Sequence, residues 1–368
     1  MKILIVSRSF YPGNWPRAFR TTELAKEFSR QEHDVTVITH EKPEQKKIID
    51  KYGIKIIDLG NKKWNTLSLN SKSVFVQKIL RVINKLTYWL FEYPNIELTF
   101  MISRILKNES GYDLLISIAH PYPVHWGVAL ATRKKKIAKT WVADCGDPYF
   151  NQENASLRPP FYFKFIDDWF MSRADHITIP IEQALKAYNQ KYHNKFRIIP
   201  QGFKLDEIRL YDGNLRSDKV VFGYAGMFIP GKRDPNQFLT FLNELDDSYL
   251  FEFHIWTHSP HLIQPFVKKS NGRIVLHNIV PREEVLYELS KMHFLVNFAN
   301  QGTVQSPSKL IDYAILNKPV LSIKHEQLSE KSVMEFLVGN YSSAMQLPNI
   351  ENYRIESIAQ SFLDLASD

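Results

Sequence analysis

The stretch from residue 2 to residue 39, KILIVSRSFYPGNWPRAFRTTELAKEFSRQEHDVTVIT, decides the fold class. Its two ends, KILIVS (2–7) and DVTVIT (34–39), are short apolar runs typical of buried strands. Between them, small and apolar residues recur at helical spacing and predict a helix over 17–31. These residues are Ala18, Thr22, Leu24, Ala25 and Phe28. A strand, a helix and a second strand in this order predict a parallel sheet.

The same alternation of strands and helices runs through most of the 368 residues, a length that favours two domains. We therefore predict an α/β protein with two doubly wound domains. The predicted further strands are 55–60, 113–119, 140–144, 220–226, 250–256, 274–278, 293–298 and 319–323, and the later helices are 235–245, 282–291 and one from Pro307. The predicted parts are a first domain over 1–203 with a helical insertion at about 61–110, a second domain over 204–349, and a closing helix within 350–368 that packs back on the first domain.

The composition predicts a globular protein of a reducing compartment. Hydrophobic residues make up 44% of the chain and charged residues 23%, which is enough apolar material for two cores. The first apolar run is too short for a signal peptide, and no apolar run approaches the length of a membrane span. A single cysteine, Cys145, excludes an internal disulfide, and we expect it to be a small buried residue in a cytoplasmic protein.

The net charge of +8 predicts an anionic partner. Nucleic acid, a membrane face and a nucleotide-linked substrate are the three classes that fit. The chain contains no helix-turn-helix, zinc-finger or RNP-type pattern, so nucleic acid is the least favoured of the three.

The insertion contains an amphipathic segment, SVFVQKILRVINKLTYWLF (73–91). Its apolar residues form one stripe, and Lys78, Arg81 and Lys85 lie on the opposite side. Two interpretations remain open: a helix that lies on an anionic membrane, and a helix that packs on its own sheet with a solvated basic face.

Ligands of doubly wound sheets bind beyond the carboxyl ends of the strands, so the candidate residues are sought there. In the second domain, the strand that ends at Gly226 leads into MFIPGKRDP (227–235). Gly226 and Gly231 permit close backbone approach, and Lys232 and Arg233 provide positive charge. Together they suit a diphosphate, although an ordinary polar turn fits the spacing equally well.

The segment SPSKLID (306–312) predicts a helix start that attracts anions. Ser306 is a plausible N-cap and Pro307 suits the first helical position, while Ser308 and Lys309 follow in the first turn. Asp312 lies one turn on and could accept hydrogen bonds from a ribose. The alternative is an i,i+3 surface ion pair between Lys309 and Asp312.

In the first domain, His120 follows one strand, and Asp144 and Asp147 follow the next. The alternatives are a structural histidine and a helix N-cap at Asp147. The loop after the first strand adds four further candidates, which are Gly13, Asn14, Arg17 and Arg20. We find no metal-ligand spacing, Ser/His/Asp arrangement or P-loop, so we expect no metal and no cofactor.

These segments resemble a known family. YPGNWPRAFRTTELAKEFSRQEHDVTVIT, ISIAHPYPVHWGVALA, WVADCGDPY, RIIPQGF and QSPSKLIDYAILNKPVLSI are similar, in this order, to segments of the retaining family 4 glycosyltransferases of the GT-B fold. The resemblance covers the chain apart from residues 61–110. It implies transfer of a sugar from a nucleotide diphosphate sugar to a hydroxyl of a glycan or lipid-linked acceptor, with retention of configuration, in surface polysaccharide biosynthesis.

The resemblance also implies roles for the candidate residues. Lys232 and Arg233 would bind the diphosphate together with the helix start at Lys309, and Asp312 would hold the ribose. Three residues are implied as catalytic, namely His120, Lys232 and Asp147. The donor would be bound by Gly13, Asn14, Gly226, Lys232, Arg233, Ser306, Ser308, Lys309 and Asp312, and the acceptor by Arg17, Asp144 and Asp147.

Three positions depart from the family pattern. A glutamate of the family falls on Val304, and two arginines fall on Met227 and Gly146. Asp312 also stands where the family usually has glutamate. These departures motivate a second hypothesis, a non-catalytic GT-B protein that binds a nucleotide or a partner enzyme. The resemblance is compatible with a peripheral position on the inner face of a membrane.

Overall fold

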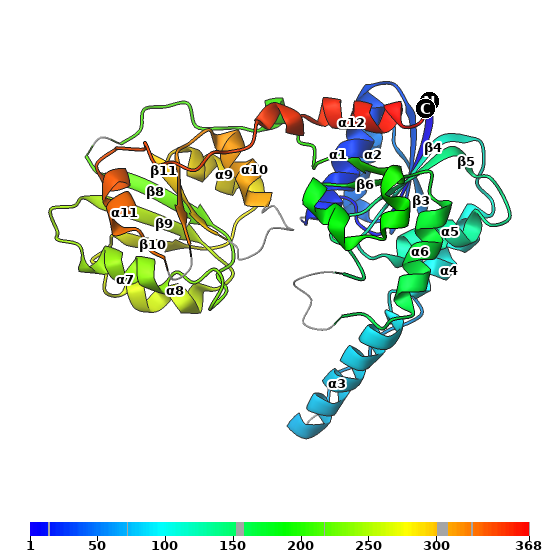
Figure 1. The fold of residues 1–368 in the computed structure, drawn as a ribbon, viewed down its shortest axis with the longest axis horizontal. Coiled ribbons are helices and arrows are strands. Elements are labelled where there is room, and N and C mark those ends of the chain that lie inside the picture. The colour runs from blue at the N-terminus through cyan, green and yellow to red at the C-terminus, as the bar shows by residue number, and fades with distance from the viewer. Residues whose placement is uncertain are drawn as a thin grey trace. The chain divides into compact units, whose positions relative to one another are not determined.

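The computed structural model describes residues 1–13, 15–71, 73–151, 158–216, 218–299, 308–324 and 327–367. The chain divides into two compact units (Figure 1). Unit 1 comprises Met1–Lys204 and Asn352–Asp368, and unit 2 comprises Leu205–Glu351.

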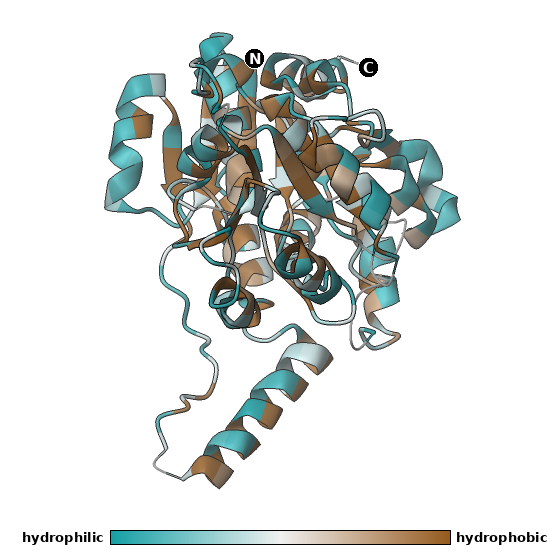
Figure 2. Cartoon of the chain, turned by 90° about the vertical axis from the view of Figure 1, so that its left-hand side faces the viewer, coloured by the Kyte–Doolittle hydropathy of each residue, from teal (hydrophilic) through white to brown (hydrophobic). Residues whose placement is uncertain are grey.

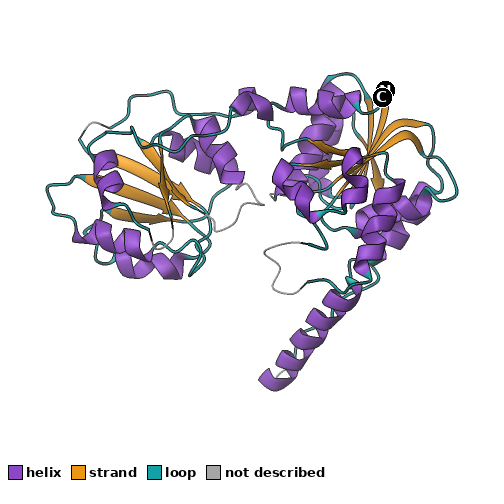
Figure 3. Ribbon diagram, viewed as in Figure 1, coloured by secondary structure: helices purple, strands orange, loops and turns teal. Residues whose placement is uncertain are grey.

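Unit 1 contains a seven-stranded sheet in which every paired strand is parallel to its neighbour (Figure 3). The strand order is β3-β2-β1-β4-β5-β6-β7. The strands are β1 (Lys2–Ser7), β2 (Asp34–Thr39), β3 (Lys55–Asp58), β4 (Tyr112–Ile118), β5 (Ala138–Asp144), β6 (His176–Ile179) and β7 (Phe196–Ile198). The central strands are apolar on both faces because helices cover both sides of the sheet.

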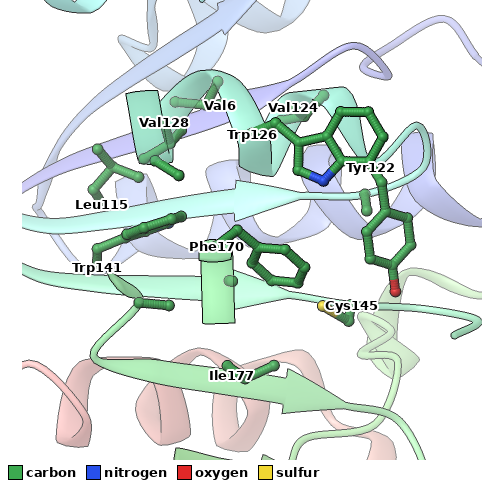
Figure 4. Packing of buried hydrophobic residues seen from close by; sticks show 14 of the residues in the cluster. Val6, Leu115, Tyr122, Val124, Trp126, Val128, Trp141, Cys145, Phe170 and Ile177 are labelled. Carbon is green, nitrogen blue, oxygen red and sulfur yellow. The ribbon is translucent and has the colours of Figure 1, made fainter. Parts of the chain in front are cut away.

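Two hydrophobic clusters lie on the two faces of this sheet. The helices of unit 1 are α1 (Pro16–Arg30), α2 (Lys46–Tyr52), α3 (Val74–Phe91), α4 (Glu97–Leu106), α5 (Pro123–Ala131), α6 (Phe163–Arg173) and α12 (Ile355–Asp364). On one face, Trp126 of α5 and Phe170 of α6 pack with Trp141 of β5 and with Cys145 just beyond that strand (Figure 4). On the other face, α1 and α12 pack together over the sheet.

The end of the chain therefore belongs to unit 1. Ile355, Ile358 and Phe362 of α12 join the cluster that contains Leu24 and Phe28 of α1. Gly202 allows this contact, because a Cβ built on it would lie 2.6 Å from the Cδ1 of Ile355.

Unit 2 contains a five-stranded parallel sheet with the order β10-β9-β8-β11-β12. The strands are β8 (Val220–Ala225), β9 (Phe251–Trp256), β10 (Ile274–His277), β11 (Phe294–Phe298) and β12 (Val320–Ile323). The helices are α7 (Asn236–Glu244), α8 (Pro260–Val267), α9 (Arg282–Ser290), α10 (Ser308–Leu316) and α11 (Glu330–Leu337). Two clusters, one on each face, make the core of this unit.

The predicted fold class is confirmed, and the sequence missed two short strands. β6 has four residues and β7 has three, too few to show a clear period. The interpretation of the insertion helix as packed on its own sheet is wrong, since none of the residues of α3 is buried. Among the residues described, no helix is both long and apolar enough to cross a membrane.

Candidate functional site

In each sheet, the chain adds successive strands first on one side of its first strand and then on the other, so the strand order reverses at one point. In unit 1, β1 lies between β2 and β4, and in unit 2, β8 lies between β9 and β11. The loops that follow β1 and β4, and the loop that follows β8, therefore flank the positions where doubly wound sheets bind ligands. Gly13, His120, Gly226 and Lys232 lie in these loops.

The loop after β8 folds into a tight turn that presents Lys232. Ile229 and Arg233 exchange two backbone hydrogen bonds of 3.1 and 2.9 Å across the turn. Gly231 has a φ of 72°, and its N–H lies 3.3 Å from the Oδ2 of Asp234. Lys232 at the tip is exposed. The turn thus presents the exposed side chain of Lys232 beside the end of β8.

Lys309 reaches this edge of the sheet from the first turn of α10. Its Nζ donates to the Oη of Tyr224 over 2.6 Å and lies 4.0 Å from the centre of the Tyr224 ring. Gly226 leaves room for the side chain, because a Cβ built on it would lie 2.1 Å from the Nζ of Lys309. The φ of 150° at Gly226 also favours glycine.

Two positive side chains meet here with little compensation. Burial and, to a smaller extent, the nearby charge of Arg233 lower the pKa of Lys309 to about 7, although Asp312 opposes them. The Nε of Arg233 is buried and has no hydrogen-bond partner among the residues described. A buried donor without a partner and a half-buried amine whose charged form is disfavoured are both stabilised by an anion.

Asp312 pairs with an arginine that the sequence did not indicate. Arg282, the first residue of α9, donates to the Oδ1 of Asp312 through Nε over 3.0 Å and also through Nη2. Burial raises the pKa of Asp312, while Arg282 and Lys309 oppose this shift. This pair with Arg282 takes the place of the i,i+3 surface ion pair between Lys309 and Asp312 that was the alternative interpretation. Among the residues described, both of these donors of Arg282 reach Oδ1.

In unit 1, Asp144 anchors two arginines of α1. Arg20 donates to both of its oxygens over 3.1 and 2.9 Å, Arg17 donates over 3.3 Å, and Thr178 over 2.7 Å. Asp144 is 1% exposed. Burial acts to raise its pKa, but the two arginines and Thr178 together hold it below the ordinary value. The geometry gives Asp144 a positioning role toward Arg17, whose side chain is 22% exposed.

The guanidinium of Arg17 fills the space beside Gly146. A Cβ built on Gly146 would lie 2.3 Å from the Nη2 of Arg17. Position 146 is where the family pattern has an arginine. A positive group therefore lies near this position, but it belongs to Arg17 at the start of α1.

Asp147 and Arg17 act electrostatically on His120. His120 is exposed, and its ring contacts the edge of Tyr122 with the ring centres 5.5 Å apart. Protein atoms around the ring lower the pKa of His120, Asp147 raises it, and Arg17 lowers it. The backbone oxygen of Asp147 accepts from the Oη of Tyr122 over 2.9 Å. Gly13 donates to the backbone oxygen of Phe10 over 3.0 Å in the neighbouring loop.

Several predicted residues lie outside the described part of the chain. They are Asn14, Ser306, Pro307 and the side chain of Ser308, and Val304 lies there as well. Among the residues that are described, no cluster of three or more histidine, cysteine, aspartate or glutamate side chains could hold a metal ion.

The structure adds two residues that the sequence analysis missed. Tyr224 lies two residues before Gly226 on the same strand, but a buried tyrosine in a strand is ordinary core material in a sequence. Arg282 is 30 residues away from Asp312 along the chain. No local pattern joins these two, and only the packing of α9 beside α10 brings them together.

The comparisons with known proteins agree with this architecture. The model of Glycosyltransferase Family 4 matches residues 19–207, just over half of the chain. A Staphylococcus aureus TarM variant, solved with fondaparinux, alpha-GlcNAc-glycerol and UDP, is 12% identical with a TM-score of 0.62, and the match covers 100% of both chains.

Two further solved structures show the same fold. The lipopolysaccharide outer core galactosyltransferase WaaB is 12% identical with a TM-score of 0.57, covering 100% of this chain and 99% of that one. The UDP-GlcNAc 2-epimerase of Neisseria meningitidis is 13% identical with a TM-score of 0.61, covering 99% of each chain. No curated protein sequence matches. From the family model and the shared architecture, the chain belongs to Glycosyltransferase Family 4 and has the GT-B fold.

Proposed function

We propose that this glycosyltransferase moves a sugar from a nucleoside diphosphate sugar to a hydroxyl of a glycan or lipid-linked acceptor, with retention of configuration, in surface polysaccharide assembly. TarM is solved with UDP and a GlcNAc-glycerol, and WaaB acts on the lipopolysaccharide outer core. Our proposal locates the reaction in the cytoplasm, at the inner face of a membrane.

One observation carries the nucleotide part of the proposal, namely the crowding of Lys309 and Arg233 at the end of β8. The Nε of Arg233 is buried without a partner among the described residues, and burial and Arg233 lower the pKa of Lys309 to about 7. A diphosphate would satisfy both groups. The exposed Lys232 would add a third positive charge, and Asp312 would accept from a ribose hydroxyl.

The chemistry then depends on stabilising the departing diphosphate. Positive groups aimed at a developing negative charge contribute most when their positions are fixed beforehand. Lys232, Arg233 and Lys309 would serve in this way, so we propose a reaction that needs no metal ion. Turnover that is unchanged by a chelator is the expected result, and a loss restored by Mg²⁺ or Mn²⁺ would contradict it.

The acceptor side is proposed for unit 1. His120 would contact the transferred sugar, Asp147 would orient the acceptor hydroxyl, and Arg17 would bind the acceptor. Retention would follow from a leaving phosphate that assists the incoming hydroxyl on the face it departs from.

Turnover with a panel of UDP-, GDP-, ADP- and TDP-sugars tests the proposal, with the anomeric configuration of the product read by NMR. Lys232→Ala is expected to lower turnover by orders of magnitude with the fold intact. The exposed Lys269 of the same unit, changed to Ala, is the matched control. Equal turnover in the two variants would remove Lys232 from the mechanism, and an inverted product would refute retention.

A second candidate function is non-catalytic binding of a nucleotide. It is favoured by Met227, 48% exposed at a position where the family pattern has an arginine. The guanidinium of Arg17 beside Gly146 counts against this candidate. It puts a positive charge close to the position where the family pattern has an arginine, although residue 146 itself is glycine. Slow hydrolysis of a donor sugar, lost in Lys232→Ala, would favour the enzyme. Binding without any hydrolysis or transfer would favour the second candidate.

A further inference from the structure

Helix α3 is anchored to the body of unit 1 at its C-terminal end. At its C-terminal end, the Nε1 of Trp89 donates to the backbone oxygen of Arg158 over 2.7 Å, and the Oη of Tyr162 donates to the backbone oxygen of Leu90. The helix has 18 residues, about 27 Å, and none of them is buried. Figure 1 shows it leaving the body of unit 1.

One extended segment, residues 61–71, runs beside the helix but leaves its apolar face uncovered. Asn84 exchanges two hydrogen bonds of 2.9 Å with the backbone of Leu67, and the side chain of Gln77 donates to Ser71 over 2.8 Å. Gln77 and Asn84 lie on the polar side of the helix. The segment therefore stabilises α3 without burying its apolar residues.

Six of the exposed apolar residues of α3 form one continuous face. At about 100° per residue, its members fall within an arc of about 120°. They are Phe75 (71% exposed), Val76 (40%), Ile79 (43%), Val82 (56%), Ile83 (38%) and Leu86 (47%). Figure 2 shows brown bands along the helix between teal ones. Single exposed apolar residues are ordinary on a protein surface, but a contiguous face of this size marks an interaction site.

The charge around this face is entirely positive. Residues 61–91 contain six lysines and arginines and no aspartate or glutamate. On the helical wheel, Arg81 lies opposite the apolar face as predicted, whereas Lys78 and Lys85 lie beside one of its edges. A second copy of the chain would bring like charges together, so self-association through this face is disfavoured.

We propose that α3 docks on an anionic lipid surface. Its apolar face would enter the boundary between headgroups and acyl chains, while Lys78, Arg81 and Lys85 would contact the lipid phosphates. Trp64 and Phe100, 38% and 50% exposed at the base of the helix, would lie at the level of the headgroups. The Trp64 ring packs on Tyr93 with the ring centres 5.9 Å apart. The docking of α3 is independent of the donor site, because no residue of unit 2 takes part in it.

Flotation of the full chain tests this docking surface. The vesicles contain three parts phosphatidylcholine to one part phosphatidylglycerol, with pure phosphatidylcholine vesicles as the comparison. The wild-type chain is expected to float with the anionic vesicles only. Lys78→Gln/Arg81→Gln/Lys85→Gln should lower the partition coefficient by about 100-fold, and Phe75→Ser/Val82→Ser/Leu86→Ser by at least about tenfold.

A matched triple variant on another helix controls for net charge. Lys46, Lys47 and Lys51 of α2 are exposed on the same unit, and their triple change to Gln should leave flotation unchanged. Circular dichroism and the melting temperature of each variant check the fold. A thermal shift with the nucleoside diphosphate that stabilises the wild-type chain separates the two proposals, since a folded α3 variant should keep this shift.

Three results would overturn the proposal. The first is a wild-type chain that stays at the bottom of the gradient, and the second is flotation that the α2 triple variant weakens as much as the α3 one. The third is a dimer in sedimentation that the serine variant dissociates, without vesicle binding, which would assign the face to a second copy.

Discussion

Lys309 connects the local packing of unit 2 with its chemistry. The residue gains a hydrogen bond to Tyr224 but lies beside Arg233 in a partly dry site, so its pKa falls from 10.5 to about 7. The charged form is thus poorly solvated until an anion arrives. A site of this kind sacrifices stability in the empty protein for binding, as functional sites often do.

Lys309→Met should therefore weaken the binding of a nucleoside diphosphate and stabilise the empty protein. Affinity should fall about 10- to 100-fold, since a hydrogen bond to a charged group contributes about 1.5–3 kcal/mol. The melting temperature should rise by several degrees. Titration calorimetry and a thermal melt measure the two effects, and Lys269→Met is the control.

The stabilisation by Lys309→Met should also depend on pH. Because the pKa of Lys309 is about 7 in the folded state and 10.5 in the unfolded state, the unfolded chain binds more protons between these values. The wild-type protein therefore gains stability from this group as the pH rises from 7 to 10.5. The advantage of the variant should be largest at pH 7 and below and fade toward pH 10.5. An advantage that grows with pH would contradict the assignment.

Gly146→Ala tests the placement of Arg17. The added Cβ would overlap the guanidinium, so we expect Arg17 to move and turnover to fall at least about tenfold with the secondary structure unchanged. In a double-mutant cycle, adding Gly146→Ala to Arg17→Ala should have little further effect. Additive losses would mean that Gly146 matters for a reason other than Arg17.

At the scale of elements, the contact of α12 with α1 closes unit 1. Phe362 is fully buried, and the guanidinium of Arg20 lies 5.1 Å from the centre of its ring. The same guanidinium holds Asp144, so α12 supports the sheet edge that carries the unit 1 candidates.

Phe362→Ala should destabilise unit 1 by about 3–5 kcal/mol, as expected for removing a buried phenylalanine side chain. Chemical denaturation measures the change. Gln360→Ala on the exposed side of α12 is the control and should alter stability by less than about 0.5 kcal/mol. Equal effects of the two changes would show that α12 does not pack as described.

The sequence predicted most of the regular elements, because their periods are strong. The strands 2–7 and 34–39 lie where the apolar runs indicated, and the helix predicted over 17–31 is α1, Pro16–Arg30. It did not predict the short strands β6 and β7, and it left open whether α3 packs on its sheet, which the structure shows it does not. An amphipathic stripe indicates only that the apolar face of the helix will be covered. Either a sheet of the same protein or a lipid surface can cover it.

The sequence predicted where the residues of the candidate site lie in the fold, but not which side chains contact one another there. Loops at strand ends and a helix start are visible in a sequence, and they led to Gly226, Lys232 and Lys309. The partners of these groups come from other elements. Arg282 on Asp312 and Tyr224 under Lys309 depend on how α9, α10 and β8 pack, which no local pattern encodes.

At the scale of the whole molecule, the two units have separate cores, so their unfolding can be told apart. We expect two transitions in calorimetry. Phe362→Ala should lower one of them, and UDP or another matching diphosphate should raise the other, because a ligand stabilises the unit that binds it. A diphosphate that raises the same transition that Phe362→Ala lowers would contradict the placement of the nucleotide site in unit 2.

The most direct test of a diphosphate site at Lys309 is the proton uptake that accompanies nucleotide binding. At pH 8, Lys309 is mostly neutral in the free protein, and a bound diphosphate should restore its charge. Titration calorimetry with UDP, GDP, ADP and TDP in buffers of different ionisation enthalpy measures the protons exchanged. We predict that one diphosphate binds with uptake of nearly one proton, and that Lys309→Met abolishes the uptake. Binding without proton uptake, or no binding of any diphosphate, would contradict a diphosphate site at Lys309.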